Sequence, residues 1–117
     1  MSENSNHQFV KYKDSHEIYI AVLGKQVLGG HDAMQFSSQI HALIEEKIKL
    51  VIIDLGYVEI MNSSGLGMLV AALGTTKKSD ILLHLASVPD KVMTLLKMTH
   101  LNEVFKIFES VDSAAKI

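Results

Sequence analysis

The sequence predicts an α/β fold: a mixed, mostly parallel β-sheet with an N-terminal β-hairpin and about four α-helices packed on it. Three observations predict this class. Apolar and polar residues alternate near the N-terminus, continuous apolar runs rich in β-branched residues follow, and the segments between these runs repeat their apolar residues every three or four positions. Strands that alternate with helices build a mostly parallel sheet, because each helix carries the chain back to the edge where the next strand starts.

Length and composition fit one domain that covers residues 1–117. The net charge of -2 gives no sign of a basic face for nucleic acid, and the absence of cysteine excludes disulfides and thiol catalysis. Residues 1–7 are polar and are expected to form a flexible tail, without the basic and apolar parts of a signal peptide. The longest apolar stretch, residues 66–73, is much shorter than a membrane-spanning helix. We therefore expect a cytoplasmic protein with no membrane partner.

The predicted hairpin rests on two segments with a period of two, which is typical of half-buried strands. The first begins at residues 9–12 and the second covers residues 18–22. The polar residues 14–15 form the turn between them. A third short strand is expected at residues 27–28, directly before two glycines.

The first helix is predicted after these glycines, with Asp32 as its N-cap. Its apolar residues recur at spacings of three and four, which places them on one stripe that faces a core. They are Ala33, Phe36, Ile40, Leu43, Ile44 and Ile48.

Strands and helices then alternate to the end of the chain. The segment 50–55 is a continuous apolar run of the kind that marks a strand covered on both faces. Pro89 suits the first turn of a helix, where its missing N–H group is not needed. The other elements are expected at about residues 64–77 (helix), 81–85 (strand), 104–108 (strand) and 110–117 (helix).

The segment from Ile60 to Leu69 carries the most informative pattern. It follows a buried strand, opens a helix and contains Asn62-Ser63-Ser64-Gly65-Leu66-Gly67. Hydroxyl and amide side chains at a helix start can accept hydrogen bonds from backbone N–H groups that have no partner within the helix. Two glycines in the first turn, each about 1 kcal/mol less favourable than alanine, leave that surface bare.

Two interpretations of this segment follow from the residues. In the first, Ser63 or Ser64 caps the helix, and the glycines allow the helix to pack closely on the sheet. In the second, the bare surface lets the backbone of another protein approach. Met68 belongs with the second interpretation, because methionine suits adaptable binding surfaces.

The same segment resembles the Asp-Ser-Ser-Gly-Leu-Gly motif of STAS-domain anti-sigma factor antagonists, where STAS stands for sulfate transporter and anti-sigma factor antagonist. The similarity covers nearly the whole chain. It includes the strand that ends in Ile53-Asp54-Leu55, the segment from Tyr57 to Met61 that precedes the motif, residues 82–85, the helix predicted at Pro89 and residues 99–108. The resemblance implies a STAS-like version of the fold predicted above.

The resemblance also implies partner switching, with no enzymatic activity, catalytic residue or cofactor. In the family, an anti-sigma factor that is also a serine kinase of the histidine-kinase-like ATPase type phosphorylates the second serine of the motif, which is Ser64 here. The unphosphorylated antagonist binds this kinase and so frees a sigma factor. The phosphorylated antagonist dissociates from the kinase, and a PP2C-type phosphatase removes the phosphate. Asp32 is included in the binding surface because, by resemblance, helix starts gather beside the motif. The expected partner-binding residues are Asp32, Asn62, Ser63, Ser64, Gly65, Leu66, Gly67 and Met68.

The chain departs from the motif at one position, where Asn62 replaces the usual aspartate. An amide can still cap the helix, but it has lost the negative charge and gained two N–H donors. A version of the domain that is not phosphorylated and acts as a scaffold is therefore an alternative to the switch.

Other classes of site have less support. The six histidines are scattered, and none forms a pair with the spacing of metal ligands, so no metal is expected: His7, His16, His31, His41, His84 and His100. The glycine-rich segments lack the Gly-Lys-Ser/Thr ending of a phosphate-binding loop. A STAS domain that binds a nucleotide or another small ligand near the helix of Ser64 remains an alternative, because helix N-termini favour anions.

Overall fold

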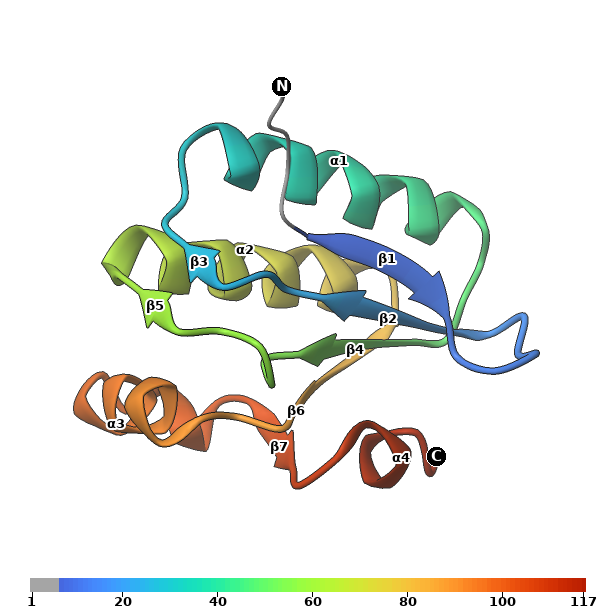
Figure 1. Cartoon of the computed structure of the whole chain (residues 1–117). Helices are drawn as coiled ribbons and strands as arrows, with labels where there is room; N and C mark the ends of the chain where they lie inside the picture. Colours follow the sequence, from blue (N-terminus) through green and yellow to red (C-terminus); the bar gives the residue numbers. More distant parts are fainter. Residues whose placement is uncertain (1–6) are drawn as a thin grey trace.

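A five-stranded sheet with the strand order β1-β2-β4-β6-β7 forms the centre of the fold (Figure 1). The computed structural model describes residues 7–117. β1 is antiparallel to β2, and the other neighbouring strands of this sheet are parallel. The predicted mixed, mostly parallel sheet with an N-terminal hairpin is confirmed. Its strands are β1 (Gln8–Lys11), β2 (Ile18–Val22), β4 (Leu50–Asp54), β6 (Leu82–Ala86) and β7 (Lys106–Phe108).

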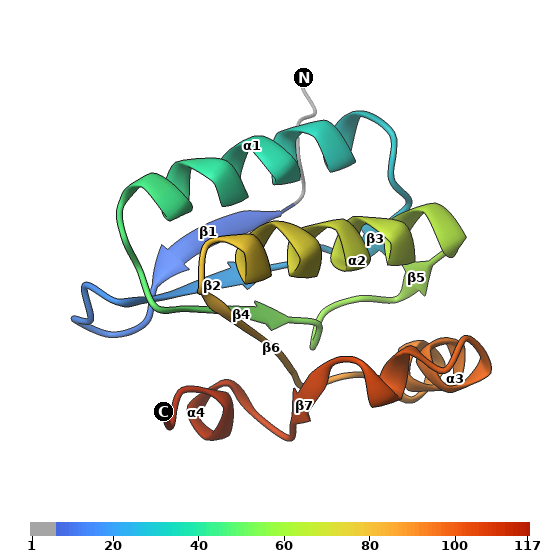
Figure 2. The same ribbon diagram turned by 180° about the vertical axis from the view of Figure 1, so that it is seen from behind.

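The two longest helices cover one face of this sheet and a short helix covers part of the other (Figures 1 and 2). α1 and α2 lie side by side on the first face, and α4 packs against β6 and β7 on the second. The helices are α1 (His31–Glu45), α2 (Ser63–Lys78), α3 (Asp90–Met98) and α4 (Val111–Ala114), with a short 3₁₀ helix η1 (Leu101–Glu103) after α3. Among residues 7–117, no helix has both the length and the apolar character needed to cross a membrane.

Two apolar cores follow from this layering. The larger lies between the sheet and the helices α1, α2 and α3, and it contains Phe36 of α1 and Leu69 of α2. The smaller lies under α4, where Ala114 packs with Ile18 and Ile52 on the opposite face of the sheet. The continuous apolar run in β4 reflects this arrangement, because Val51 and Ile52 point to different cores and both are buried.

A second, two-stranded parallel ladder lies apart from the main sheet. It joins β3 (Gln26–Val27) to β5 (Ile60–Met61). The predicted short strand at residues 27–28 corresponds to β3, one residue earlier, whereas β5 was not predicted. Because β3 leads into α1 and β5 leads into α2, the ladder places the starts of these two helices at the same edge of the fold.

Several predicted boundaries were wrong in detail. The N-cap of α1 is Gly30 and not Asp32, which lies inside the first turn, where an acidic side chain favours the helix dipole. Pro89 is the N-cap of α3 rather than a residue of its first turn. The last helix spans only Val111–Ala114, with Ser110 as its N-cap.

The predicted tail needs a correction at its last residue. Residues 1–6 lie outside the described residues. His7 is buried, with 9% of its surface exposed, and its Nδ1 accepts a hydrogen bond of 3.1 Å from the Gly24 N–H group. His7 therefore belongs to the packed part of the chain.

Candidate functional site

The starts of α1 and α2 lie close together, and we define the helix-start edge as Gly29, which precedes α1, together with residues 62–67. The β3–β5 ladder pairs Val27 with Met61, and the Asn62 N–H group donates to the Val27 carbonyl at 3.4 Å. Two segments that are distant in the sequence are thus held together by their backbones immediately before each helix begins.

Asn62 is the residue that caps α2. Its backbone is extended, with φ of -110°, and its Oδ1 accepts a hydrogen bond of 2.8 Å from the Gly65 N–H group. The interpretation that Ser63 or Ser64 caps the helix is therefore wrong, since both serines already lie within the first turn. Both are exposed, and neither hydroxyl makes a hydrogen bond with residues 7–117. The two serines are consequently available to solvent and to other molecules.

Glycines let the two helix starts approach each other. A Cβ atom on Gly65 would overlap the Val27 carbonyl oxygen, so α2 can rest on this backbone only if residue 65 has no side chain. A Cβ atom on Gly29 would lie 2.8 Å from the Cβ of Ser64. Gly67, in contrast, faces open space, with no atom within 4 Å of an added Cβ. The glycines at 65 and 29 therefore serve packing, and Gly67 leaves bare surface.

Ser64 lies beside an uncharged groove between α1 and α2. The groove has a volume of about 250 Å³ and is lined from α1 by Ala33, Phe36, Ser37 and Ile40, and from α2 by Ser64, Gly67, Met68, Ala71, Ala72 and Thr75. None of these side chains is charged. An anion on Ser64 would therefore find no basic partner among the residues that line this groove.

Three of the predicted partner-binding residues are buried. Leu66 and Met68 are each 5% exposed and belong to the core under α2, and Gly65 is buried against Val27. Met68 also lines the groove, so a partner could reach part of it, but the side chain of Leu66 is not available. Asn62, Ser63, Ser64 and Gly67 are exposed, as the prediction requires.

Asp32 is half-buried and faces the N-terminal segment. Its Oδ2 lies 3.5 Å from Nε2 of His7. Burial lowers the pKa of the His7 imidazole, and the Asp32 carboxylate opposes part of that decrease. Asp32 therefore contributes to fixing His7 against α1, and it is not among the residues that line the groove beside Ser64.

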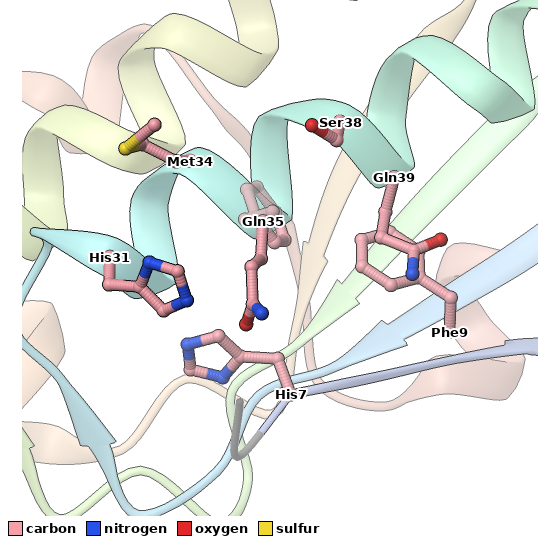
Figure 3. A pocket seen from close by; sticks show the side chains of 8 residues that line it. His7, Phe9, His31, Met34, Gln35, Ser38 and Gln39 are labelled. Atoms are coloured by element: carbon pink, nitrogen blue, oxygen red, sulfur yellow. The ribbon is translucent and has the colours of Figure 1, made fainter. Parts of the chain in front are cut away.

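A second hollow lies on the outer side of α1, between this helix and β1 (Figure 3). It is a wide groove of about 600 Å³ lined by His7, Phe9, His31, Met34, Gln35, Phe36, Ser38 and Gln39. Two histidines line it, yet no three His, Asp or Glu side chains among residues 7–117 are grouped as metal ligands would be. The groove is mixed in polarity and offers no constellation for catalysis.

The sequence did not point to Gly29, Ala33 or Ser37 as parts of the site. Two consecutive glycines were a signal in the sequence, because glycine readily adopts positive φ angles. Gly29 and Gly30 have such angles, 83° and 67°. Ala33 and Ser37 belong to the site only because α1 packs beside α2, which no local pattern shows.

Comparison with known proteins assigns the fold. A model of the family described as the STAS domain matches residues 17–114. An anti-sigma-factor antagonist (STAS) domain protein from Planctomyces limnophilus has 20% sequence identity and a TM-score of 0.76, with 96% of each chain covered.

Two further solved structures are similar. TM1081 of Thermotoga maritima, a proposed anti-sigma factor antagonist, has 22% identity and a TM-score of 0.74, covering 92% of this chain and 90% of that one. The phosphorylated form of SpoIIAA, a Bacillus cell fate determinant, has 14% identity and a TM-score of 0.69, covering 92% of this chain and 95% of that one. At these identities the likeness establishes a shared fold.

Proposed function

The chain belongs to the STAS domain family, and we propose that it is an anti-sigma factor antagonist that works as a cytoplasmic protein-binding switch. Unphosphorylated, it binds an anti-sigma factor that is also a serine kinase of the histidine-kinase-like ATPase type, and so frees a sigma factor. Phosphorylation of Ser64 releases the kinase, and a PP2C-type phosphatase restores the first state. The observation that carries the proposal is the exposed Ser64 at the start of α2, beside an uncharged groove.

Ser64 is a better acceptor candidate than its neighbour. Both serines are exposed, but only Ser64 lines the groove between α1 and α2 and contacts the loop before α1. A group added to Ser64 therefore changes the surface that both helices share. The same group on Ser63 would leave the groove unchanged.

The fold can accept a phosphate at this position. Phosphate adds a charge of about -1.5 to -2 near neutral pH. At the start of a helix such a charge is favoured by roughly 0.3–1 kcal/mol. Asn62, the cap of α2, is neutral and adds no repulsion. We therefore expect phosphorylation to leave the fold of the domain unchanged.

A bound partner would not tolerate the phosphate. The residues that line the groove include no lysine, arginine or histidine, so a partner covering it would bury the phosphate without a counter-charge from this chain. A buried, unpaired charge in an interface typically costs about 2–5 kcal/mol, which corresponds to at least 30-fold in affinity. Tolerance in the free domain together with disruption of the complex is what a reversible switch requires.

The proposal is tested with a purified anti-sigma kinase and ATP, followed by mass spectrometry of the intact antagonist. We expect one phosphate per chain, its absence in Ser64→Ala, and its retention in the matched control Ser63→Ala. Stoichiometric phosphate on Ser63 would contradict the assignment. No phosphate with any kinase of this type, combined with retained partner binding, would favour the scaffold alternative.

The contact surface is tested separately by calorimetric titration of the same kinase. Gly67 is exposed and faces open space, so Gly67→Arg should keep the fold and weaken binding. Ser64→Asp should weaken binding in part, because a carboxylate carries less charge than phosphate. Unchanged affinity in both variants would place the contact surface elsewhere. Binding of a nucleotide to the antagonist alone would support the small-ligand alternative.

A further inference from the structure

We infer that Gly29 is a positioning residue for Ser64, so that the loop between β3 and α1 builds the acceptor site together with the motif in α2. This inference rests on the proposed function, because it concerns how Ser64 is presented to a kinase. The two residues are distant in the sequence and are brought into contact only by the fold.

The contact between them is close on the Gly29 side. A Cβ atom on Gly29 would lie 2.8 Å from the Cβ of Ser64 and 3.3 Å from its carbonyl carbon. Carbon atoms that are not bonded pack best at about 3.5–4.0 Å. The Cβ of Ser64 carries the hydroxyl group, so any side chain on Gly29 would push directly on the atom that holds the acceptor oxygen.

Neither side of this contact can move away easily. Ser64 is fixed in the first turn of α2 by the hydrogen bond from Gly65 to the Asn62 side chain. The loop is fixed through Val27, whose carbonyl accepts from the Asn62 N–H group and lies against Gly65. A methyl group on Gly29 must therefore displace Ser64 or distort the junction that orients it.

Displacement of Ser64 matters for phosphoryl transfer. The acceptor oxygen must lie in line with the leaving group and about 3–3.5 Å from the atom it attacks. A displacement of about 1 Å can reduce the rate by about 100-fold. For Gly29→Ala we therefore expect a kcat for Ser64 phosphorylation that is lower by about 10- to 100-fold, with a KM changed less than threefold.

Gly30 provides a stringent control. Its backbone, with φ of 67° and ψ of -134°, disfavours alanine, yet an added Cβ would meet no atom within 4 Å. If backbone strain in the loop were the cause, Gly30→Ala would impair Ser64 as much as Gly29→Ala. If contact with Ser64 is the cause, only Gly29→Ala will do so.

A thiol probe tests the contact without a kinase. The chain has no cysteine, so Ser64→Cys introduces a single thiol, and Ser63→Cys introduces one at the neighbouring position. Both thiols lie at the same helix start and experience a similar helix dipole. We expect Gly29→Ala to slow alkylation by iodoacetamide at least threefold at position 64 and less than 1.5-fold at position 63, whereas Gly30→Ala changes neither rate. Equal rates at position 64 with and without Gly29→Ala would overturn the inference.

A comparison of melting temperatures tests the inference even if Gly29→Ala strongly destabilises the protein. Ser64→Gly removes the Cβ that the new methyl group would meet. Gly29→Ala should then lower the melting temperature less in the Ser64→Gly background than in the original protein, while the strain from the positive φ of 83° at position 29 remains in both. Equal losses in both backgrounds would overturn the inference.

The phosphorylation arm separates the two proposals. Absence of phosphate on Ser64 in the unaltered protein would contradict the proposed function and leave the thiol result standing. A normal kcat in Gly29→Ala, when Ser64 of the unaltered protein is phosphorylated, would contradict the inference alone.

Discussion

The helix-start edge and the C-terminal end of the chain are held in opposite ways. At the helix-start edge, Gly65 packs against the Val27 backbone and Gly29 packs against Ser64, and neither glycine has a side chain. At the other end, side chains attach α4 to the sheet, and we call this contact, made by residues 110–115 with Tyr12 and His84, the C-terminal latch. The Tyr12 hydroxyl donates to Asp112 at 2.6 Å, and His84 donates from Nδ1 to the Ala114 carbonyl at 2.8 Å.

The difference shows which part of the molecule is suited to each task. Contacts between backbones leave the surface bare and contain no group that titrates near neutral pH, so the helix-start edge keeps its shape as conditions change. The C-terminal latch covers apolar residues of the sheet and depends on ionisable side chains. We therefore expect substitutions in the latch to alter stability while the proposed acceptor site is preserved.

The largest effect is expected for Gly65→Ala, which attacks the backbone contact itself. The new methyl group would overlap the Val27 carbonyl, so we expect a loss of about 3 kcal/mol or more in the free energy of unfolding. Gly74→Ala in the same helix is the matched control, because its Cβ would face open space. It should stabilise the protein by about 0.5–1 kcal/mol. Urea denaturation measures both, and a loss below 1 kcal/mol for Gly65→Ala would show that α2 is not fixed at this point.

An intermediate effect is expected for His84→Leu, which attacks the C-terminal latch. His84 is 4% exposed, and leucine has no N–H group to donate to the Ala114 carbonyl. We expect the free energy of unfolding to fall by about 1–3 kcal/mol. Amide exchange should become faster in α4 and stay slow in α1 and α2. His16→Leu, at an exposed position in the turn before β2, should change neither quantity. Equal loss of protection in α2 would mean that the two regions are coupled.

The order of strands and helices could be predicted because it depends on local periodicity. The apolar stripe of α1 and the continuous apolar run of β4 each indicate burial through their own residue pattern. The buried position of Leu66 could also have been predicted, since it is followed at helical spacing by Leu69, Ala72 and Thr76, all buried. The resemblance of the motif to a binding surface favours exposure of Leu66, whereas the helical spacing favours its burial.

Other features could not be predicted because they depend on contacts that are distant in the sequence. β5 has two residues and is a strand only because β3 lies beside it. The cap of α1 is set by the conformation of Gly30, which allows the chain to turn after β3. The contact between Gly29 and Ser64 exists only once both helices have packed on the same face.

A smaller effect is expected for Asn62→Ala, which removes the only side-chain cap described at the helix-start edge within residues 7–117. Loss of the hydrogen bond to Gly65 should cost about 1 kcal/mol. Asn62→Asp keeps an acceptor oxygen at the same place and should remain within a few tenths of a kcal/mol of the original protein. Thermal unfolding of the three proteins measures this order. A loss in Asn62→Asp as large as that in Asn62→Ala would show that the amide contributes more than its acceptor.

The smallest effect is a dependence on acidity confined to the C-terminal latch. The pKa of the Asp112 carboxyl is lowered from its ordinary value of 3.8, first by the hydrogen bond from Tyr12 and then by the Lys13 ammonium group. A carboxyl with a lowered pKa contributes stability above its ordinary pKa and loses this contribution as the pH falls through the lowered value. The original protein should therefore unfold at a slightly higher temperature than Asp112→Asn at pH 7, and the difference should vanish in strong acid. A difference that stays constant with pH would exclude ionisation of Asp112 as its source.

The position of α4 in the chain has a consequence for synthesis on the ribosome. The hydrogen bond between Tyr12 and Asp112 joins residues 100 positions apart, so α4 closes over a hairpin that is synthesised well before it. Until Ala114 has left the exit tunnel, Ile18 and Ile52 lack the helix that packs over them in the finished fold. During that interval the nascent chain exposes part of this apolar face, and such faces bind chaperones or aggregate. The helix-start edge needs only the chain up to the end of α2, so the surface proposed for partner binding can form while the opposite side of the sheet is still open.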